Sequence, residues 1–542
     1  MELVSVAKLF RTKPAQQLID EAYQSDRPMK RGLSAFDLIA FGVGATIGSG
    51  IFALTGTAAA GQPSLARDWL TTPIINFILG SPLGRDGAGP AIAVSFIVAA
   101  IACGFAAMCY AELAAMIPVS GSAYTFAYAA LGELVAWIIG WDLILEYAVG
   151  NVAVAVSWSD YFLHLLHSAT GLQLPLWLTA DTTTALTRLS ATTAGSPLSA
   201  LYANTTLPSI FGHPFAINVP ALAIVALITL VLVVGIRESA MINTLMVLIK
   251  VVVVLLFLAY GLGHVNPANW VPFFPSGLAG VMGGAAIVFF SFIGFDAVSS
   301  TAEETKNPQR DMPIGMIGSL IICTFLYAAV SLVLTGILPY RAYTNDAAPV
   351  ATALSHAGTI WADLIVSAGA LAGMTSVLLV FQLGQPRIFM AMARDRLLPP
   401  VFARLHPHFR TPIFPTLLTG IIVGVSALFI DIGQAAELTN IGTLAAFIIV
   451  CGGVIVLRKT EPTRERHFQC PFVPFVPLAG IISCFLLMLS LPVITWFRFV
   501  IWMTVGMVVY FTYGFHKSDQ ASESGAEARS TIQIGASHRP GE

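Results

Sequence analysis

The sequence predicts an all-α polytopic membrane protein with about twelve transmembrane helices, of which the first and the sixth are broken. Composition is the first observation, because 56% of the 542 residues are hydrophobic and 10% are charged. The mean hydropathy is +0.80, and no soluble fold buries that much apolar surface. Second, the apolar residues form runs long enough to cross a bilayer, and third, two of these runs contain glycines near mid-membrane. A net charge of −2 gives no reason to expect a nucleic-acid partner.

The apolar runs place the expected helices, with hydrophilic segments between them. We expect transmembrane helices near residues 35–60, 90–116, 127–164, 217–236, 240–262, 278–300, 313–338, 358–386, 413–431, 434–457, 474–490 and 493–515. The organisation that follows is a tail at 1–34, a first five-helix repeat at 35–262, a second at 278–457, two further helices at 474–515 and a disordered cytosolic tail at 516–542. The first segment is polar and lacks a small-residue cleavage site, so it predicts a cytosolic tail and not a signal peptide. The outer loops at 62–89 and 168–218 have no role that the sequence assigns.

Basic residues give the orientation, since the cytosolic loops of membrane proteins carry an excess of Lys and Arg. With the N-terminus inside, the cytosolic segments hold most of the basic residues. The outer segments hold only Arg67, Arg85, Arg188, Arg341 and Arg498. We therefore expect both termini to be cytosolic.

Glycines concentrate at the centre of the first expected helix, in the segment 42–52 (GVGATIGSGIF). In hydrocarbon, a broken helix persists only where protein or a polar cavity satisfies its freed backbone groups. The N–H groups that open the second half-helix would suit a carboxylate, and the carbonyls that end the first half would suit a cation. The same glycines could instead form a small-residue face for close helix packing. The segment alone leaves both interpretations open.

The sixth expected helix contains a second interruption, where Gly294 and Asp296 fall near mid-membrane. The first and sixth helices cross the membrane in opposite senses, as two inverted five-helix repeats require. Paired breaks at matching positions of two halves point to the binding site of a transporter. The pair therefore predicts a 5+5 inverted-repeat transporter, although close packing would explain Gly294 alone.

Ionisable residues lie inside the expected helices, where charge is costly and is functional by default. Lys250 lies about 15 Å from the cytosolic start of the fifth helix, which is close to the midplane. A desolvated lysine can gain and lose a proton near neutral pH. Asp142 and Glu146 are four apart on the third helix and share a face. Counting Lys250 against Glu146 and Asp296 leaves a surplus carboxylate, which favours proton coupling, a basic substrate or both.

Several motifs resemble the amino acid–polyamine–organocation (APC) superfamily. The segment 44–52 (GATIGSGIF) is similar to the first-helix signature of that superfamily, and so are 110–112 (YAE) and 118–124 (PVSGSAY). The segments 291–296 (SFIGFD) and 303–311 (EETKNPQRD) resemble the sixth helix and its cytosolic sequel in the cationic amino acid transporter branch, bacterial type. The segment 137–147 (WIIGWDLILEY) is similar to the third helix of that branch. The resemblance covers roughly residues 30–515, and the long loop at 62–89 departs from it.

This resemblance implies a LeuT-like fold with two extra C-terminal helices and alternating access around a site between the first, third, sixth and eighth helices. The substrate-binding residues that it implies are Thr46, Ile47, Gly48, Ser49, Gly50, Glu146, Asn151, Phe290, Ile293 and Asp296. N–H groups of Ser49 and Gly50 would hold an α-carboxylate, and carbonyls of Thr46, Phe290 and Ile293 would hold an α-amine. In proton-coupled relatives a lysine at the matching point of the fifth helix is thought to take the place of a sodium ion. The resemblance extends that role to Lys250.

We therefore expect a secondary active transporter in the plasma membrane (the inner membrane of a bacterial cell) that takes up an L-amino acid with a proton. Exchange and sodium coupling stay open as alternatives. Thr375 and Ser376 on the eighth helix offer hydroxyl ligands for sodium, but Lys250 would repel a second cation. An ion channel would need a polar pore stripe or filter, which the sequence lacks. The identity of the amino acid and the oligomeric state also stay open.

A membrane-embedded enzyme is a poor fit to this sequence. Such an enzyme would need a nucleophile–base pair or a metal cluster inside the membrane. His164 and His167 lie at an outer helix end, and the six cysteines have no metal-type spacing. We expect no catalytic residue, no metal and no cofactor.

Overall fold

A computed structural model gives the fold and describes residues 9–14, 16, 32–61, 68–119, 122–192, 206–235, 240–344, 346, 348–358, 360–409 and 411–518. Within these residues, eight helices are long and apolar enough to cross a membrane, or nine if one bent pair counts as a single span. Three shorter apolar helices accompany them. The chain is therefore a multi-pass, predominantly helical membrane protein. The tail predicted to be disordered, 516–542, lies almost entirely outside the described residues.

The apolar helices follow one another along the chain, with short turns and surface elements between them. They are α3 (Ala35–Thr46) with η1 (Gly50–Leu54) and α4 (Thr55–Ala60), α6 (Ile92–Met116), α8 (Glu133–Thr170), α11 (Val219–Val234), α12 (Ala240–Gly261), α13 (Gly277–Val288) with η6 (Phe289–Phe292) and η7 (Asp296–Glu304), α14 (Pro308–Ile337), α16 (Ile360–Arg394), α17 (Ile413–Phe429), α18 (Ile432–Thr460), α19 (Phe475–Leu489), and α20 (Val493–Val509) with η10 (Tyr510–Gly514). The connecting elements are α5 (Ile74–Leu79), η2 (Gly89–Ala91), α7 (Ser122–Ala130), η3 (Leu176–Leu178), α9 (Thr182–Thr192), the antiparallel pair β1 (Ser209–Ile210) and β2 (His213–Pro214), η4 (Leu262–His264), η5 (Pro267–Trp270), η8 (Tyr340–Tyr343), α15 (Pro349–His356) and η9 (Pro400–Ala403).

The first span is interrupted inside its glycine-rich segment. α3 begins behind a capping box, in which the Ser34 hydroxyl accepts from the N–H of Asp37 and the Asp37 carboxylate accepts from the N–H of Ser34. The helix ends at Thr46 because Ile47 is extended, with φ −73° and ψ 104°. The chain then resumes as η1 and α4, bent by 44° from α3. The last carbonyls of α3 therefore need partners from outside the helix.

The second interruption follows α13 and η6. Ile293 is extended, with φ −61° and ψ 126°. Gly294 then adopts φ +122°, which glycine tolerates without strain, and a Cβ at this position would lie 2.8 Å from the carbonyl oxygen of Ala45. A Cβ on Gly50 would similarly lie 2.5 Å from the Cα of Ser291. The two breaks therefore touch each other, with a glycine at each contact.

The third helix differs from its expected range of 127–164. The structure has two helices there, α7 and then α8, which runs from Glu133 to Thr170. Gly132 separates them with φ +94°, and a Cβ on it would lie 2.6 Å from the backbone of Phe10. A left-handed residue cannot continue a helix, and the apolar pattern hid this stop. The two long loops also contain structure, namely α5 in the first, and α9 and the β1–β2 hairpin in the second.

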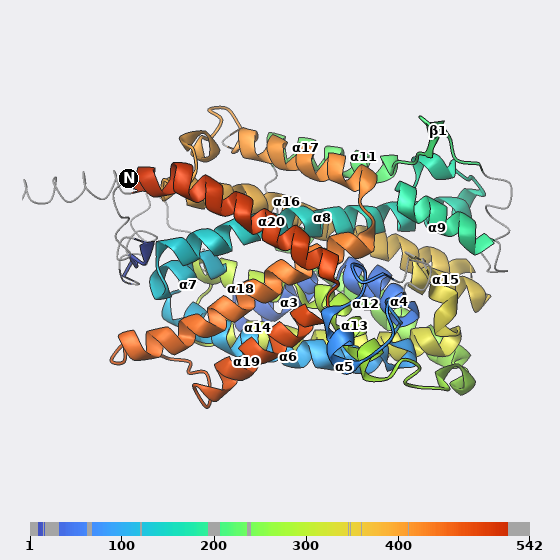
Figure 1. Ribbon diagram of the computed structural model, residues 1–542, viewed down its shortest axis with the longest axis horizontal. Helices are drawn as coiled ribbons and strands as arrows, with labels where there is room; N and C mark the ends of the chain where they lie inside the picture. Colours follow the sequence, from blue (N-terminus) through green and yellow to red (C-terminus); the bar gives the residue numbers. More distant parts are fainter. Residues whose placement is uncertain are drawn as a thin grey trace, which may run out of the picture.

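Packing places α8 at the centre of the molecule. It packs against α16, α17 and α18, while α14 packs against α3 and α6. Peripheral apolar side chains are exposed, such as Leu230 (62%) on α11, Ile421 (63%) on α17 and Ile501 (63%) on α20. An apolar rim around a buried core is what a bilayer requires of its protein. Figure 1 shows the long helices running in roughly one direction, with α7 at one end and α9, β1 and α15 at the other.

Candidate functional site

Side chains from other helices satisfy the carbonyls at the end of α3. The ammonium of Lys250, on α12, donates to the carbonyl of Gly44 at 2.6 Å. The hydroxyl of Tyr327, on α14, donates to the carbonyl of Thr46 at 2.9 Å. The N–H of Ile47 donates to the carbonyl of Val43 at 2.9 Å. The break is thus held open by one titratable donor and one hydroxyl donor from two different helices.

Only 1% of the surface of Lys250 is exposed. Its aliphatic chain crosses Gly373 on α16, because a Cβ on that glycine would lie 3.0 Å from the Cγ of Lys250. The thiol of Cys323 on α14 lies close enough to Lys250 to interact electrostatically and also contacts the side chains of Tyr327 and Thr46. The lysine therefore fills the space between the first break and α16.

Two hydroxyls at the breaks are buried without a hydrogen-bond partner among the described residues. They are the hydroxyls of Ser49 and Ser291. Ser49 was predicted as a site residue, whereas Ser291 was recognised only as part of a motif. Ser291 lies against Gly50, so its hydroxyl is at the junction of the two breaks. Buried polar groups are normally satisfied, so these two hydroxyls are free to bond to a water molecule or a polar ligand at the junction.

The aromatic residues of the second break do not all have the same surroundings. Phe292 packs against Tyr327 with ring centroids 5.4 Å apart, and Phe295 packs against Phe447 at 5.3 Å. Phe290 is 5% exposed and makes no ring contact within the described part of the chain. Phe292 and Phe295 belong to the packed core. Phe290 is buried in η6 without such a ring partner among the described residues.

The three predicted carboxylates are all buried, and Glu146 lies close enough to both Asp296 and Asp142 to interact with them electrostatically. Glu146 and Asp142 face α18, where the Glu146 side chain hydrogen-bonds with Thr443 and a Cβ on Gly442 would lie 2.5 Å from Oδ1 of Asp142. That Oδ1 has no hydrogen-bond partner in the described structure. Asp296 instead accepts from the N–H of Gly294 at 3.2 Å, within the break. Asp296 therefore shapes the second break.

Asn151 lies on α8, little more than one turn beyond Glu146, and it is fully buried. Both of its amide atoms lack a hydrogen-bond partner among the described residues. Asn440 on α18, which the sequence did not single out, donates to the carbonyl of Ala286 at 2.7 Å and holds α13 near its end. The only sign of this role in the sequence is that Asn440 is a polar residue in a long apolar segment.

A buried ion pair lies near each end of the helix bundle. At one end, Arg458 donates twice to Glu112 at 2.8 Å, and the N–H of Cys470 donates to the same carboxylate at 2.7 Å. At the other end, the guanidinium of Arg85 forms a bidentate pair with Glu437. Glu112 and Glu437 are 2% and 1% exposed, so both pairs are desolvated at the carboxylate. Bidentate pairs of this kind are strong and oriented.

The sequence of this chain matches a known protein family and several characterised relatives. The family model described as "Amino acid permease" matches residues 33–513. The methylthioribose transporter of Bacillus subtilis (strain 168) is 44% identical over 508 residues, which are 94% of this chain and 98% of the relative. The branched-chain amino acid permease BcaP of the same organism is 44% identical over 506 residues, 93% and 97% of the two chains. The vacuolar cationic amino acid transporter 4 of Arabidopsis thaliana is 36% identical over 441 residues, 80% of this chain and 64% of the relative.

Proposed function

We propose that this chain, which belongs to the amino acid permease family, takes up an amino acid with a proton by alternating access around its two broken helices. Its relatives are named as permeases and transporters, so it is a transporter and not an enzyme. The observation that carries the proposal is the bond from the Lys250 ammonium to the Gly44 carbonyl at the end of the first half-helix. A titratable donor at a helix break links a proton to the shape of the binding site.

The substrate backbone would bind at the junction of the breaks. The α-carboxylate would accept from the N–H groups of Ser49 and Gly50, at the positive end of the second half-helix. The α-amine would donate to carbonyls of Thr46, Phe290 and Ile293. The extended backbone of Ile47 ends the first half-helix beside these groups, and the buried hydroxyls of Ser49 and Ser291 lie at the two breaks.

The substrate side chain would extend toward α8, with Phe290 over it. Glu146 and Asn151 are the buried polar groups there, and Asn151 has no partner of its own in the described structure. The two Bacillus relatives have equal identity, yet one is named for branched-chain amino acids and the other for methylthioribose. Overall sequence identity therefore does not identify the substrate. In this proposal, Glu146, Asn151 and Phe290 would determine which side chain is accepted.

Proton coupling fits the surroundings of Lys250 better than sodium coupling. The lysine lies where a cation would otherwise satisfy the freed carbonyls. The Thr375 hydroxyl, a candidate sodium ligand, already donates to the carbonyl of Leu371 at 2.8 Å and accepts from Trp158 at 2.9 Å. We propose the 5+5 repeat of about twelve helices, cytosolic termini and a location in the plasma membrane, on the basis of the paired breaks and the basic loops.

The experiment is uptake into liposomes that contain the purified protein, under an imposed inward pH gradient and with or without sodium. We expect the amino acid to accumulate when the pH gradient is imposed, to the same extent with and without sodium. Amino acid methyl esters should fail to compete, because they lack the carboxylate that the first break would hold. Sodium-dependent uptake without a pH effect would overturn proton coupling. Competition by methylthioribose but not by free amino acids would replace the proposed substrate class.

A further inference from the structure

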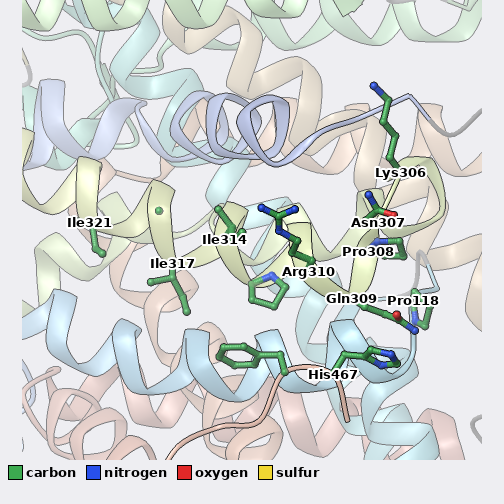
Figure 2. Close-up of a pocket in the computed structure, with 13 residues that line it drawn as sticks. Pro118, Lys306, Asn307, Pro308, Gln309, Arg310, Ile314, Ile317, Ile321 and His467 are labelled. Atoms are coloured by element: carbon green, nitrogen blue, oxygen red, sulfur yellow. The ribbon is translucent and has the colours of Figure 1, made fainter. Parts of the chain in front are cut away.

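A surface cavity of about 1080 Å³ lies at the beginning of α14, outside the site described above. Figure 2 shows its walls: α14 carries most of the labelled side chains, and His467 approaches from the opposite side. The lining changes character along the helix. Polar side chains gather at the first turn, and an isoleucine stripe follows.

The polar end is cationic. Its charged lining residues are Lys306 and Arg310, and none of the lining residues is acidic. Both basic side chains are exposed. Lys306 lies near the Asp37 carboxylate and in Figure 2 projects away from the other labelled side chains, and His467 lies 3.4 Å from the Glu465 carboxylate. The Arg310 guanidinium forms no ion pair or hydrogen bond within the described residues, so Arg310 is the cation that faces the cavity. Such an end is complementary to an anionic group.

The rest of the cavity is apolar and has a defined length. Ile314, Ile317 and Ile321 form one stripe on α14 (Figure 2), and Phe468 also lines the cavity. Ile321 is 63% exposed, so this stripe is open at the surface of the protein. Eleven residues separate Arg310 from Ile321, which is about 16 Å along a helix. That length matches one leaflet, half of a hydrocarbon core of about 30 Å.

We propose that this cavity binds one anionic phospholipid of the cytosolic leaflet, with its phosphate at Arg310 and an acyl chain along the isoleucine stripe. The leaflet follows from the proposed orientation of the transporter, which puts the start of α14 inside the cell. A soluble anion would use only the cationic end, and a lipid without a phosphate only the stripe. A zwitterionic phospholipid would bring the cation of its headgroup close to Arg310, which disfavours it. The combination of both at this spacing selects a phospholipid with a net negative charge.

The same site adjoins the end of η7, which follows the second break. Lys306 lies two residues beyond η7, and its N–H donates to the carbonyl of Leu33 at 2.9 Å. The N–H of Gly32 donates to the carbonyl of Glu304 at 2.8 Å. The end of the cavity wall is thus bonded to the segment just before α3.

The test is lipid binding to the purified protein in detergent, measured by native mass spectrometry and by thermal shift. The probes are phosphatidylglycerol, phosphatidylcholine and inorganic phosphate. Phosphatidylglycerol should bind and stabilise, and Arg310→Gln should weaken it about fivefold, since a basic residue near the headgroup contributes about 1 kcal/mol. Ile317→Trp, which fills the groove and keeps the charges, should also weaken it. Lys459→Gln, an exposed cation elsewhere, should leave binding unchanged.

Three results would overturn the proposal: equal binding of both lipids, an Arg310→Gln protein that binds phosphatidylglycerol like the parent, or displacement of the lipid by inorganic phosphate at equal concentration. Binding is read without transport. A parent protein that transports but does not bind phosphatidylglycerol rejects this inference alone, and a parent protein that binds phosphatidylglycerol but shows no proton-driven uptake rejects only the transport proposal.

Discussion

At the end of α3, two side chains from other helices take the place of the next helical turn. Lys250 donates to Gly44 and Tyr327 donates to Thr46. Leaving a buried carbonyl without its donor costs on the order of 1–3 kcal/mol. The donors differ in that a buried lysine readily changes its charge, whereas a tyrosine hydroxyl at neutral pH does not. Lys250 is therefore the candidate switch, and Tyr327 is a fixed clamp.

Lys250→Met should abolish proton-driven accumulation in liposomes and leave part of the substrate binding intact. Methionine keeps the apolar length, removes the proton and leaves the Gly44 carbonyl without its donor. Tyr327→Phe is the matched control, because it removes a donor from the same break without removing a titratable group. It should weaken binding while accumulation still follows the pH gradient. A Met variant that concentrates substrate would remove Lys250 from the coupling mechanism.

Glu146→Gln should change the ranking of basic against neutral amino acids in a competition assay. The substitution keeps the hydrogen bond with Thr443 possible and removes the negative charge beside Asn151. Asp142→Gln is a control for charge on the same helix one turn away, next to Gly442. An unchanged ranking in the Glu146 variant, with normal expression, would place this residue outside the pocket.

The roles of some site residues could be predicted from the sequence alone, and the roles of others could not. Lys250 could be predicted because a charge at mid-membrane is informative by itself. Tyr327 could not, since a tyrosine in an apolar helix is ordinary and its role depends on which carbonyl lies opposite. The same holds for Asn440, which supports α13 from another part of the chain.

At the scale of elements, the broken helices depend on glycine in two ways. Gly294 supplies a left-handed backbone, and it also allows contact with the carbonyl of Ala45. Gly50 supplies only the close approach to Ser291. Glycine spacing in the sequence suggested either breaks or packing, and the structure shows that the same residues do both.

Gly294→Ala should destabilise the protein by about 1–3 kcal/mol, because alanine strains at φ +122° and its Cβ would press on the first break. Thermal unfolding in detergent measures this. Gly283→Ala is the control: it lies on α13, and a Cβ there meets no atom within 4 Å. Alanine at that helical position should be neutral or slightly stabilising. Equal melting temperatures for the two variants would contradict the role given to Gly294.

Over the whole molecule, the apolar runs located the long helices, but they did not show what seals the ends. The split between α7 and α8 was missed because Gly132 sits in a continuous apolar pattern. The ion pair between Arg85 and Glu437 joins residues that are 352 positions apart, so no local sequence pattern predicts it. Local composition therefore predicts the spans, whereas the long-range ion pairs between them are seen only in the structure.

The final prediction concerns the ion pairs Arg85–Glu437 and Arg458–Glu112. Alternating access requires that weakening one end shifts the population toward the conformation open at that end. Arg85→Gln leaves the buried Glu437 carboxylate without its cation, which is strongly unfavourable. Thr57, which lines a cavity with Arg85 and is 7% exposed, reports on that end when it is replaced by cysteine. In Arg85→Gln, Thr57→Cys should react with a membrane-impermeant maleimide at least about fivefold faster, the ratio expected for a shift near 1 kcal/mol.

Arg458→Gln, at the opposite end, should slow the labelling of the same cysteine, because it favours opening toward Glu112. Arg341→Gln, an exposed arginine in η8, should leave the rate unchanged. The native cysteines are buried and give a low background. If both gate variants changed the rate in the same direction, the two ion pairs would be general supports of the fold, and the alternation of gates would have to be assigned to other residues.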